Sequence, residues 1–551
     1  MSHRICDLDG GPMPQSEPIV LGLNVGHDGG CAIFAGGKIV AVAEERINRT
    51  RYSSGWIAAL YYCLDAVKVP LERVDLVVFS SIGERLPTGF TGGLENFGLR
   101  PNRTMIVDHH LSHAYTAYCL SDFETAVVAV IDGAGNDADT ESYHIANSDG
   151  LTRIASNDPD RPRSGGIGAT YEAFTNYIGF HEQEAGKTMA LASYGDSTQW
   201  SLPLFEVSGL QVAGRLRATH EVGVIDLARR DALNFGRPYE VDSQTAMDLA
   251  AWVQSETERA VSGVIAELVN RTGIRAVCLA GGVAMNCVAN ERVRLQTKAD
   301  LFVPPPASDR GQALGNMLIG YHKLTKEVYK SPLRRDEFGR TYSEDEILSA
   351  LRRHPHIMHS ERHPRASFAF HRESDPALTA AQLLANGKLV GWFQGGSELG
   401  ARALGSRSIL ADPRTIDSRE RLNRQLKRRE WFRPFAPAAT SETVGDWFDV
   451  DDIPNAFMLF TATVRESKRA QLRGVTHIDG TSRLQSVIAA DHPLFHSVIE
   501  HFGEITGVPA ILNTSFNVRE PIVESPADAL ATFRSTALDA MFLGDYLVSK
   551  Q

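Results

Sequence analysis

Two histidines four residues apart stand where a strand would lead into a helix, in the string DHHLSH at 108–113. If the helix has begun there, His109 and His113 lie on one face, where two imidazoles can bind one metal ion. The alternative is a pair of buried histidines that satisfy hydrogen bonds at a helix start. The glutamate of H-E-x-x-H, the general base of zincins, is absent, so this string does not predict such a protease.

Two aspartates stand at positions that could complete a metal site. Asp132 ends the apolar run AVVAVID, and Asp309 lies in the loop string PPPASDRG. Folds of the α/β class place ligands at such strand ends and loops. Two imidazoles and two carboxylates suit Fe(II), Zn(II) or Mn(II) better than Mg(II), which prefers oxygen ligands alone. We therefore predict a metal site made of His109, His113, Asp132 and Asp309.

Three glycine-rich turns follow predicted strands, at 26–30, 132–136 and 281–286. Such turns bring backbone N–H groups close to phosphate, which only small residues allow sterically. A single turn of this kind is more simply a tight connection, but three at corresponding places favour nucleotide binding. The candidate residues are Gly133, Gly135, Gly281 and Gly282. No turn has the sequence of a P-loop or of the dinucleotide-binding motif G-x-G-x-x-G.

Positive charge gathers in one segment of the chain. Residues 402–433 hold nine Arg and one Lys against four acidic residues, whereas the whole chain has a net charge of −11. About half of these charges are expected on a solvated helix face, but cations among glycines suit a pocket for phosphorylated compounds. The expected phosphate-binding residues are Arg402, Arg407, Lys427 and Arg433, with Arg483, Ser515 and Asn517 from later strings. Lys187 is a separate candidate, for which a solvated helix-start lysine is the alternative.

The order of elements in the first 345 residues predicts two similar α/β halves. Three strands, a helix, a strand, a helix and a strand follow one another, which is the order of a ribonuclease-H-like unit. A helix over 248–271, a strand at 276–282 and a helix over 286–297 belong to the second half. We expect a two-lobed, actin-like domain over 19–345. The first half has predicted strands at 75–80, 105–110 and 126–133 and helices over 56–68 and 113–120.

A different pattern follows the first domain. Residues 346–375 are charged, rich in histidine and weakly periodic, so we expect a linker there. A second α/β pattern fills 376–551, with a predicted helix over 418–430 and a predicted strand over 456–465. The tail from about residue 526 could pack on either domain.

Composition limits the class of protein. Apolar residues make up 43% and charged residues 22%, which is typical of a globular enzyme. Six cysteines without a C-x-x-C pair predict neither a zinc finger nor a disulfide framework. No apolar run is long enough for a signal peptide or a membrane helix, so we expect a cytoplasmic protein without a membrane partner. The acidic balance also disfavours a nucleic-acid partner.

Several long strings together resemble one enzyme family. VGHDGG, AEERINR, DHHLSHA, VIDGAG, GKTMALASYG, LAGGVAMN, GWFQGGSELGARALGSRSILADPR, KRREWFRPFAP, NTSFN and ESPADAL are similar, in order and spacing, to the O-carbamoyltransferases of antibiotic biosynthesis. The resemblance implies an actin-like TsaD-like domain followed by a YrdC-like α/β domain. It also implies that the enzyme carbamoylates a hydroxyl of a small natural product, for which macrolides and ansamycins are examples.

The resemblance implies roles for the candidate residues. The second domain would form carbamoyladenylate from carbamoyl phosphate and ATP, supplied with Mg, and the first domain would transfer the carbamoyl group. His27 and Asp28 would activate the acceptor hydroxyl, and Asn286 and Asp309 would flank the nucleotide beside the glycines. The metal would be iron(II), with Zn(II) or Mn(II) as alternatives. A homodimer is left open as the oligomeric state.

Three other functions are alternatives to carbamoyl transfer to a small natural product. The threonylcarbamoyl modification of tRNA uses the same two folds, but it predicts a large basic surface. The carbamoyltransferase of [NiFe]-hydrogenase maturation carries zinc-finger cysteine pairs, which are absent from this sequence. An actin-like kinase with an accessory binding domain explains neither the paired histidines nor the arginine-rich segment.

Overall fold

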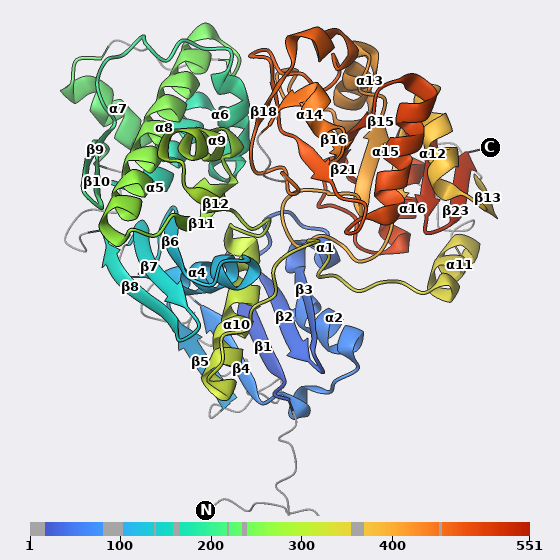
Figure 1. Cartoon of the computed structure of the whole chain (residues 1–551), viewed down its shortest axis with the longest axis horizontal. Coiled ribbons are helices and arrows are strands. Elements are labelled where there is room, and N and C mark those ends of the chain that lie inside the picture. The colour runs from blue at the N-terminus through green and yellow to red at the C-terminus, as the bar shows by residue number, and fades with distance from the viewer. Residues whose placement is uncertain are drawn as a thin grey trace, which may run out of the picture.

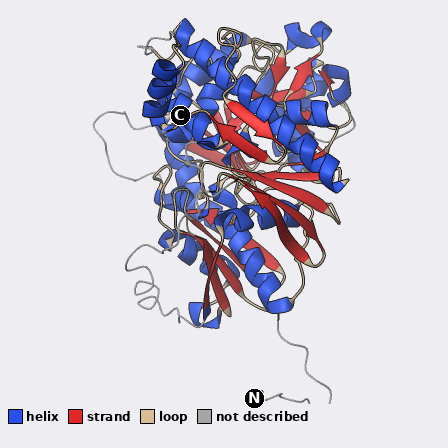
Figure 2. Cartoon of the chain, turned by 90° about the vertical axis from the view of Figure 1, so that its left-hand side faces the viewer, coloured by secondary structure: helices blue, strands red, loops and turns tan. Residues whose placement is uncertain are grey.

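The computed structural model describes residues 17–80, 103–136, 139–157, 165–217, 220–233, 240–353, 368–450 and 455–550. Two units lie side by side in this part of the chain (Figure 1). The N-terminal unit ends with α10 (Gln312–Thr325), and the C-terminal unit comprises α11 (Glu344–Arg353) and the chain from β13 (Phe368–Arg372) onward. Strands are flanked by helices in both units (Figure 2).

The first sheet of the N-terminal unit has the described strand order β3–β2–β1–β4–β5. The first three strands are antiparallel neighbours, and β4 and β5 run parallel to β1. Helices α1 and α2 lie between β3 and β4 in the chain. The bounds are Val20–Asn24 (β1), Gly30–Ala35 (β2), Lys38–Ala43 (β3), Glu44–Asn48 (α1), Ile57–Val67 (α2), Leu76–Ser80 (β4) and Thr104–Val107 (β5).

The second sheet repeats the arrangement of the first, with the described order β8–β7–β6–β11–β12. Again three strands are antiparallel neighbours and two more run parallel to the first of them. Two similar α/β halves are therefore present, as expected, but the strand predicted at 126–133 belongs to the second sheet and not to the first half, because it pairs with β7 and β11. The strands are Ala126–Ile131 (β6), Glu141–Asn147 (β7), Gly150–Ser156 (β8), Ala276–Ala280 (β11) and Asp300–Phe302 (β12).

Helices α4 (His109–Leu120) and α10 pack between the two sheets, and their apolar residues form one core with both. The contact is close because a Cβ on Gly315 would lie 2.0 Å from the carbonyl oxygen of Ser112. Other helices cover the outer face of the second sheet (Figure 1). They are Ile167–Ile178 (α5), Ala185–Ala192 (α6), His220–Arg230 (α7), Gln244–Thr272 (α8) and Cys287–Thr297 (α9), with the hairpin Phe205–Ser208 (β9) and Gln211–Gly214 (β10).

The C-terminal unit is built on a mixed sheet whose order, within the described ranges, is β13–β23–β22–β14–β15–β21–β16–β20. A small sheet of β17, β18 and β19 lies beside it. The strands are Val390–Phe393 (β14), Arg407–Ala411 (β15), Ala436–Thr440 (β16), Phe448–Asp449 (β17), Ala462–Val464 (β18), Thr481–Ser482 (β19), Gln485–Val487 (β20), Ala510–Ser515 (β21), Ala540–Leu543 (β22) and Tyr546–Lys550 (β23). The helices are Pro376–Ala385 (α12), Ile416–Arg421 (α13), Val444–Trp447 (α14), Pro493–Thr506 (α15) and Pro526–Ser535 (α16).

The structure differs from the expectation of a linker over 346–375. Helix α11 buries Ile347 and Leu351 in the C-terminal core, and β13 pairs with β23 at the edge of the large sheet. Residues 354–367 lie outside the described part of the chain. The tail from residue 526 packs on the C-terminal unit, because β22 and β23 complete its sheet.

Two further expectations need correction. The helix predicted over 418–430 ends earlier, because π-helical turns over Leu422–Lys427 follow α13 and Arg428 has a φ of 47°. Of the strand predicted over 456–465, only β18 is extended. The apolar side chain of Leu459 instead packs into the core of the N-terminal unit, and the φ of Met458 is 57°. Among the described helices, none is both long and apolar enough to cross a membrane.

Candidate metal centre and anion site

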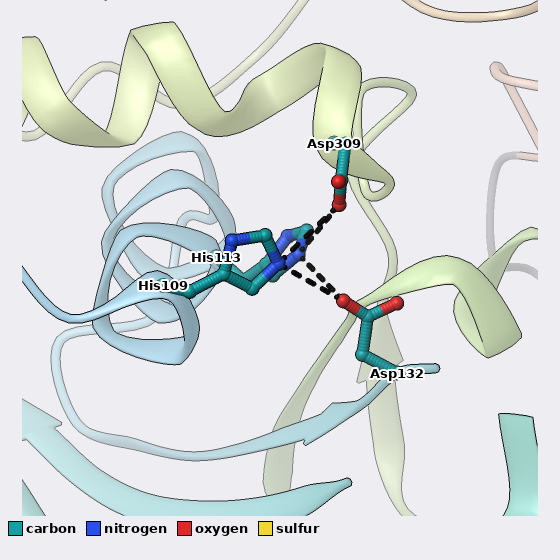
Figure 3. A group of neighbouring side chains, drawn as sticks. All are labelled: His109, His113, Asp132 and Asp309. Carbon is teal, nitrogen blue, oxygen red and sulfur yellow. Dashed lines mark hydrogen bonds and ion pairs between the residues drawn. The ribbon is translucent and has the colours of Figure 1, made fainter. Parts of the chain in front are cut away.

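The two histidines and two aspartates predicted as metal ligands meet in one buried cluster (Figure 3). Helix α4 begins at His109, four residues before the predicted start, because the side chain of Asp108 accepts a hydrogen bond from the backbone N–H of Leu111. This N-cap places His109 and His113 on the same face of the first turns. The cluster is contributed by α4, the end of β6 and the loop before α10.

The distances within the cluster fit a single metal ion. The Nε2 atoms of His109 and His113 lie 3.1 and 3.2 Å from Oδ2 of Asp132, and 3.5 and 3.2 Å from Oδ1 of Asp309. Ligands that bind one ion at about 2.1 Å are about 3.0–3.4 Å apart in octahedral or tetrahedral geometry. The four donor atoms all lie within 4.8 Å of one another. The donor set and its spacing therefore suit a transition metal.

The pKa of each side chain in the cluster depends on the charges of the others. Burial lowers the pKa of His109, but the carboxylates of Asp309 and Asp132 outweigh it and raise the value to about 10. Burial raises the pKa of Asp132, but the hydrogen bonds from the two imidazoles hold it well below its usual range. Two buried carboxylates thus stay ionised only because positive charge faces them. A divalent cation would supply that charge and leave the imidazoles neutral.

Both aspartates are held in place from outside the cluster, Asp132 through its carboxylate and Asp309 through its backbone. Oδ1 of Asp132 accepts a hydrogen bond of 2.8 Å from the backbone N–H of Gly282. Gly281 has a φ of +88°, and a Cβ there would lie 2.3 Å from the carbonyl oxygen of Ile131, so only glycine allows this turn to approach β6. On the other side, the amide of Asn24 donates to the carbonyl oxygen of Asp309 over 3.2 Å. The 281–286 turn therefore positions a carboxylate of the cluster.

His27 and Asp28, the expected catalytic pair, lie beside the cluster. Nε2 of His27 lies 3.2 Å from Oδ2 of Asp309, and its Nδ1 lies 3.6 Å from Oδ2 of Asp28. The contact with the Asp28 carboxylate and the charge of Asp309 raise the pKa of His27 to about 9. The His27 side chain is half exposed, whereas the cluster is buried. His27 is thus the part of this site that is open to solvent.

The remaining nucleotide candidates of the N-terminal unit have partners within the protein. Asn286 caps α9, since its Oδ1 accepts from the backbone N–H of Ala289, and it also exchanges hydrogen bonds with Gln254. The ammonium of Lys187 lies 2.8 Å from the carboxylates of both Glu184 and Glu430. Lys187 therefore joins the two units rather than standing free for phosphate.

Gly133 and Gly135 allow other side chains to come close. A Cβ on Gly133 would lie 3.1 Å from Oε1 of Glu172, and one on Gly135 would lie 2.6 Å from the ring of His110. No hydrogen bond or ion pair of Glu172 is present among the described residues, although burial raises its pKa to about 7. Its carboxylate lies near His27 and Asp132, whose charges act on it.

Two arginines of the C-terminal unit have no counter-ion. Within the described residues, Arg402 and Arg483 make no hydrogen bond or ion pair, and the Nε atom of each is buried. Burial and the charges of Arg483 and Arg433 lower the pKa of Arg402 to about 9. The charge of Arg310 lowers it further, so Arg402 lies within electrostatic range of the N-terminal site. These unpaired guanidinium groups are therefore candidates for binding an anion.

Lys427, Ser515 and Asn517, which the sequence predicts to share one site, lie together. The ammonium of Lys427 donates to the carbonyl oxygens of Ser515 and Asn517 over 2.5 and 2.8 Å and to Oδ1 of Asn517 over 2.8 Å. Arg433 lies 3.7 Å from Glu430 and is partly exposed. Burial lowers the pKa of Lys427, and the charges of Arg429 and Arg433 add to the effect.

The structure corrects the expectation for Arg407. Its guanidinium is fully buried, lies 3.6 Å from the centre of the Phe393 ring and donates to the carbonyl oxygens of Gln394, Gly395 and Glu524. Every one of its three nitrogens has a backbone acceptor. Arg407 therefore holds the glycine-rich segment after β14 in place, and its guanidinium is turned to backbone carbonyls rather than to an open phosphate site.

Two family models match most of the chain. The model for the N-terminus of carbamoyltransferases matches residues 98–318, and the model for the C-terminus matches residues 381–550. The chain belongs to the carbamoyltransferase family. The two matches divide this carbamoyltransferase as the structure does, into the unit that holds the histidine cluster and the unit that holds the arginines.

Curated relatives extend over nearly the whole carbamoyltransferase. Nodulation protein NolNO of Sinorhizobium fredii is 35% identical over 95% of this chain and 79% of its own length. Nodulation protein NolO of Bradyrhizobium diazoefficiens is 35% identical over 81% of this chain and 79% of its own. The 3'-hydroxymethylcephem-O-carbamoyltransferase of Amycolatopsis lactamdurans is 26% identical over 96% of this chain and 98% of its own.

The structure of the carbamoyltransferase adds two site residues that sequence reasoning missed. Asn24 donates to the carbonyl oxygens of His27 and Asp28 as well as to that of Asp309, so it connects the turn that carries His27 to the histidine cluster. Arg310 lies 3.4 Å from Asp28 and 2.9 Å from Glu45. The signals were a polar residue ending the apolar run VLGLN and a basic residue directly after Asp309.

Proposed function

We propose that this carbamoyltransferase uses ATP to activate the carbamoyl group of carbamoyl phosphate and transfers it to a hydroxyl of a small natural product. The observation that carries the proposal is the pair of unpartnered arginines, Arg402 and Arg483, within electrostatic range of the histidine cluster. Relatives named as O-carbamoyltransferases of a hydroxymethylcephem support oxygen as the acceptor atom. A macrolide or ansamycin acceptor belongs to the same proposal.

The proposal assigns a fold to each unit. The repeated five-stranded sheets would form an actin-like, TsaD-like unit, because both halves have the strand order of a ribonuclease-H-like unit. The large mixed sheet would form a YrdC-like unit. A nucleotide that binds at the junction of the two units could then contact residues of both units.

The first step would take place at the arginines of the C-terminal unit. Water releases orthophosphate from carbamoyl phosphate, and an oxygen of the resulting carbamate attacks the α-phosphorus of ATP while pyrophosphate leaves. The product is carbamoyladenylate, a mixed anhydride. Arg402, Arg433 and Arg483 would bind the phosphate oxygens, since guanidinium groups bind them bidentately and stabilise the charge of a departing pyrophosphate. Lys427 would hold Ser515 and Asn517 in position beside them.

The second step would take place at the histidine cluster. The acceptor oxygen forms a bond to the carbamoyl carbon, the bond from that carbon to the phosphate oxygen breaks, and AMP leaves. His27 would take the hydroxyl proton, and Asp28 would orient its ring. A metal ion, proposed to be iron(II), would be held by His109, His113, Asp132 and Asp309. It would stabilise the negative charge of the adenylate phosphate. It would also weaken the attraction of the Asp309 carboxylate for the proton of His27.

The test separates the two steps. Purified protein is supplied with ATP and carbamoyl phosphate, and exchange of labelled pyrophosphate into ATP reports the first step. Addition of a panel of hydroxylated natural products, followed by mass spectrometry, reports a gain of one carbamoyl group together with release of AMP. Phosphorylation of an acceptor instead, or carbamoylation of tRNA, would contradict the proposal.

A further inference from the structure

The loop between α1 and α2 reaches from the catalytic turn to the C-terminal unit. At one end, the backbone N–H of Gly29 donates to the carbonyl oxygen of Ser53 over 2.8 Å, so the loop lies directly against the turn that carries His27. At the other end, the guanidinium of Arg49 donates to the carbonyl oxygens of Pro521 and Ile522 over 2.6 and 2.7 Å. The loop is thus fixed to both units.

The loop has a defined shape of its own. The side chain of Asn48 donates to Oγ of Ser53 over 2.8 Å and accepts from the backbone N–H of Thr50 over 2.9 Å. Tyr52 has a φ of 56°, and its ring is stacked on that of His181 at 6.1 Å between centres. These contacts hold the backbone on both sides of Arg51, so the loop fixes the place from which the Arg51 side chain extends.

Arg51 itself is exposed and has no acceptor among the described residues. Among the described residues its guanidinium contacts the ring of Tyr52, whose centre lies 5.1 Å from the guanidinium carbon. Yet it lies near two cations of the other unit: after burial, the charges of neighbouring cations, Arg51 included, hold down the pKa of both Lys427 and Arg433. The anchoring supports this placement, because Arg49 binds the carbonyls of Pro521 and Ile522, which stand four and five residues after Asn517, a partner of Lys427.

We propose that Arg51, from the N-terminal unit, completes the anion site of the C-terminal unit by binding a phosphoryl group that lies against Lys427 and Arg433. An exposed guanidinium that faces other cations gains a counter-ion only when an anion arrives, and a charge-assisted contact of that kind is strong. Because the same loop touches the catalytic turn, occupation of the anion site would also fix the position of that turn. The identity of the anion as carbamoyl phosphate rests on the proposed function.

Three variants of the full-length protein test the inference. Arg51→Met removes the charge at similar length, Arg51→Lys retains it, and Arg229→Met removes an exposed arginine from α7 as a matched control. Titration calorimetry with orthophosphate and with carbamoyl phosphate measures affinity, and thermal unfolding checks the fold. We expect Arg51→Met to weaken both anions by about tenfold or more, Arg51→Lys to recover most of the affinity, and Arg229→Met to match the unaltered protein.

The outcomes distinguish this inference from the proposed function. Unchanged affinity in Arg51→Met overturns the inference, and so does an unaltered protein that binds neither anion. Arg51-dependent orthophosphate binding without pyrophosphate exchange would leave the inference standing and overturn the proposed reaction. If Arg51→Met folds poorly, the affinity of Arg51→Lys for the anions is measured at low and at high salt. An affinity that equals that of the unaltered protein at low salt and is lost at high salt supports the charge contact. Binding that does not depend on salt contradicts it.

Discussion

Asp309 faces two histidines with its two carboxylate oxygens. Oδ1 lies 3.2 Å from Nε2 of His113 inside the buried cluster, and Oδ2 lies 3.2 Å from Nε2 of His27 at its open side. One side chain therefore connects the candidate metal centre with the candidate base. Since the amide of Asn24 holds both the backbone of Asp309 and the turn of His27, the connection is rigid on both sides.

The position of His27 predicts a selective defect. His27→Ala should leave pyrophosphate exchange unchanged, because the arginines of the first step belong to the other unit. Transfer should slow by about 10²–10⁴-fold, the usual contribution of a general base. Carbamoylated acceptor is quantified by mass spectrometry with each half-reaction measured separately. Equal loss of both steps would contradict the assignment.

The histidine cluster predicts metal binding that depends on His113. The unaltered protein should retain a divalent transition metal after dialysis and should unfold at a higher temperature with the metal than after chelation. His113→Ala should lose most of the metal and the metal-dependent part of the thermal stability. His501→Ala, which alters a histidine on α15 in the other unit, is the control. Elemental analysis decides the point, and full metal content in His113→Ala would refute the ligand assignment.

Arg402 and Arg407 stand five residues apart and should respond in opposite ways to loss of charge. Arg402→Met should abolish pyrophosphate exchange without loss of stability, because an unpaired charge beside Arg483 opposes folding. Arg407→Met should lower the free energy of unfolding by about 2–4 kcal/mol, because it leaves buried carbonyl oxygens without donors. Denaturant unfolding of both variants provides the comparison. A stability loss as large in Arg402→Met as in Arg407→Met would be incompatible with an open anion site.

His144 predicts a stability loss in acid. It is buried on β7, neither ring nitrogen has a partner in the described structure, and burial lowers its pKa to about 4. The unfolded chain takes up a proton near pH 6.5 and the folded protein does not, so stability is unaffected above pH 6.5 and falls as pH decreases toward 4. The contribution is up to about 3 kcal/mol at pH 4. His144→Leu should flatten the unfolding curve over this interval, and an unchanged slope would exclude His144 as the cause.

The sequence by itself determined the order of elements and most of the membership of the site. Alternation and helical periodicity are local properties, so two similar α/β halves and a second α/β unit could be predicted from them, whereas the place of 126–133 in the second sheet could not. The pair His109 and His113 also followed, because the spacing of four places both on one helix face. Asp132 could be expected at the site because α/β folds place ligands at strand ends.

Only the tertiary structure decided what each candidate contacts. Arg402 and Arg407 stand in one glycine-rich string, but one stays unpaired at the junction and the other donates to the carbonyls after β14. Leu459 is not in a strand as predicted, because its side chain packs into the apolar core of the neighbouring unit. These outcomes depend on residues far away in the chain, whose positions exist only after the units have packed, and no local pattern encodes them.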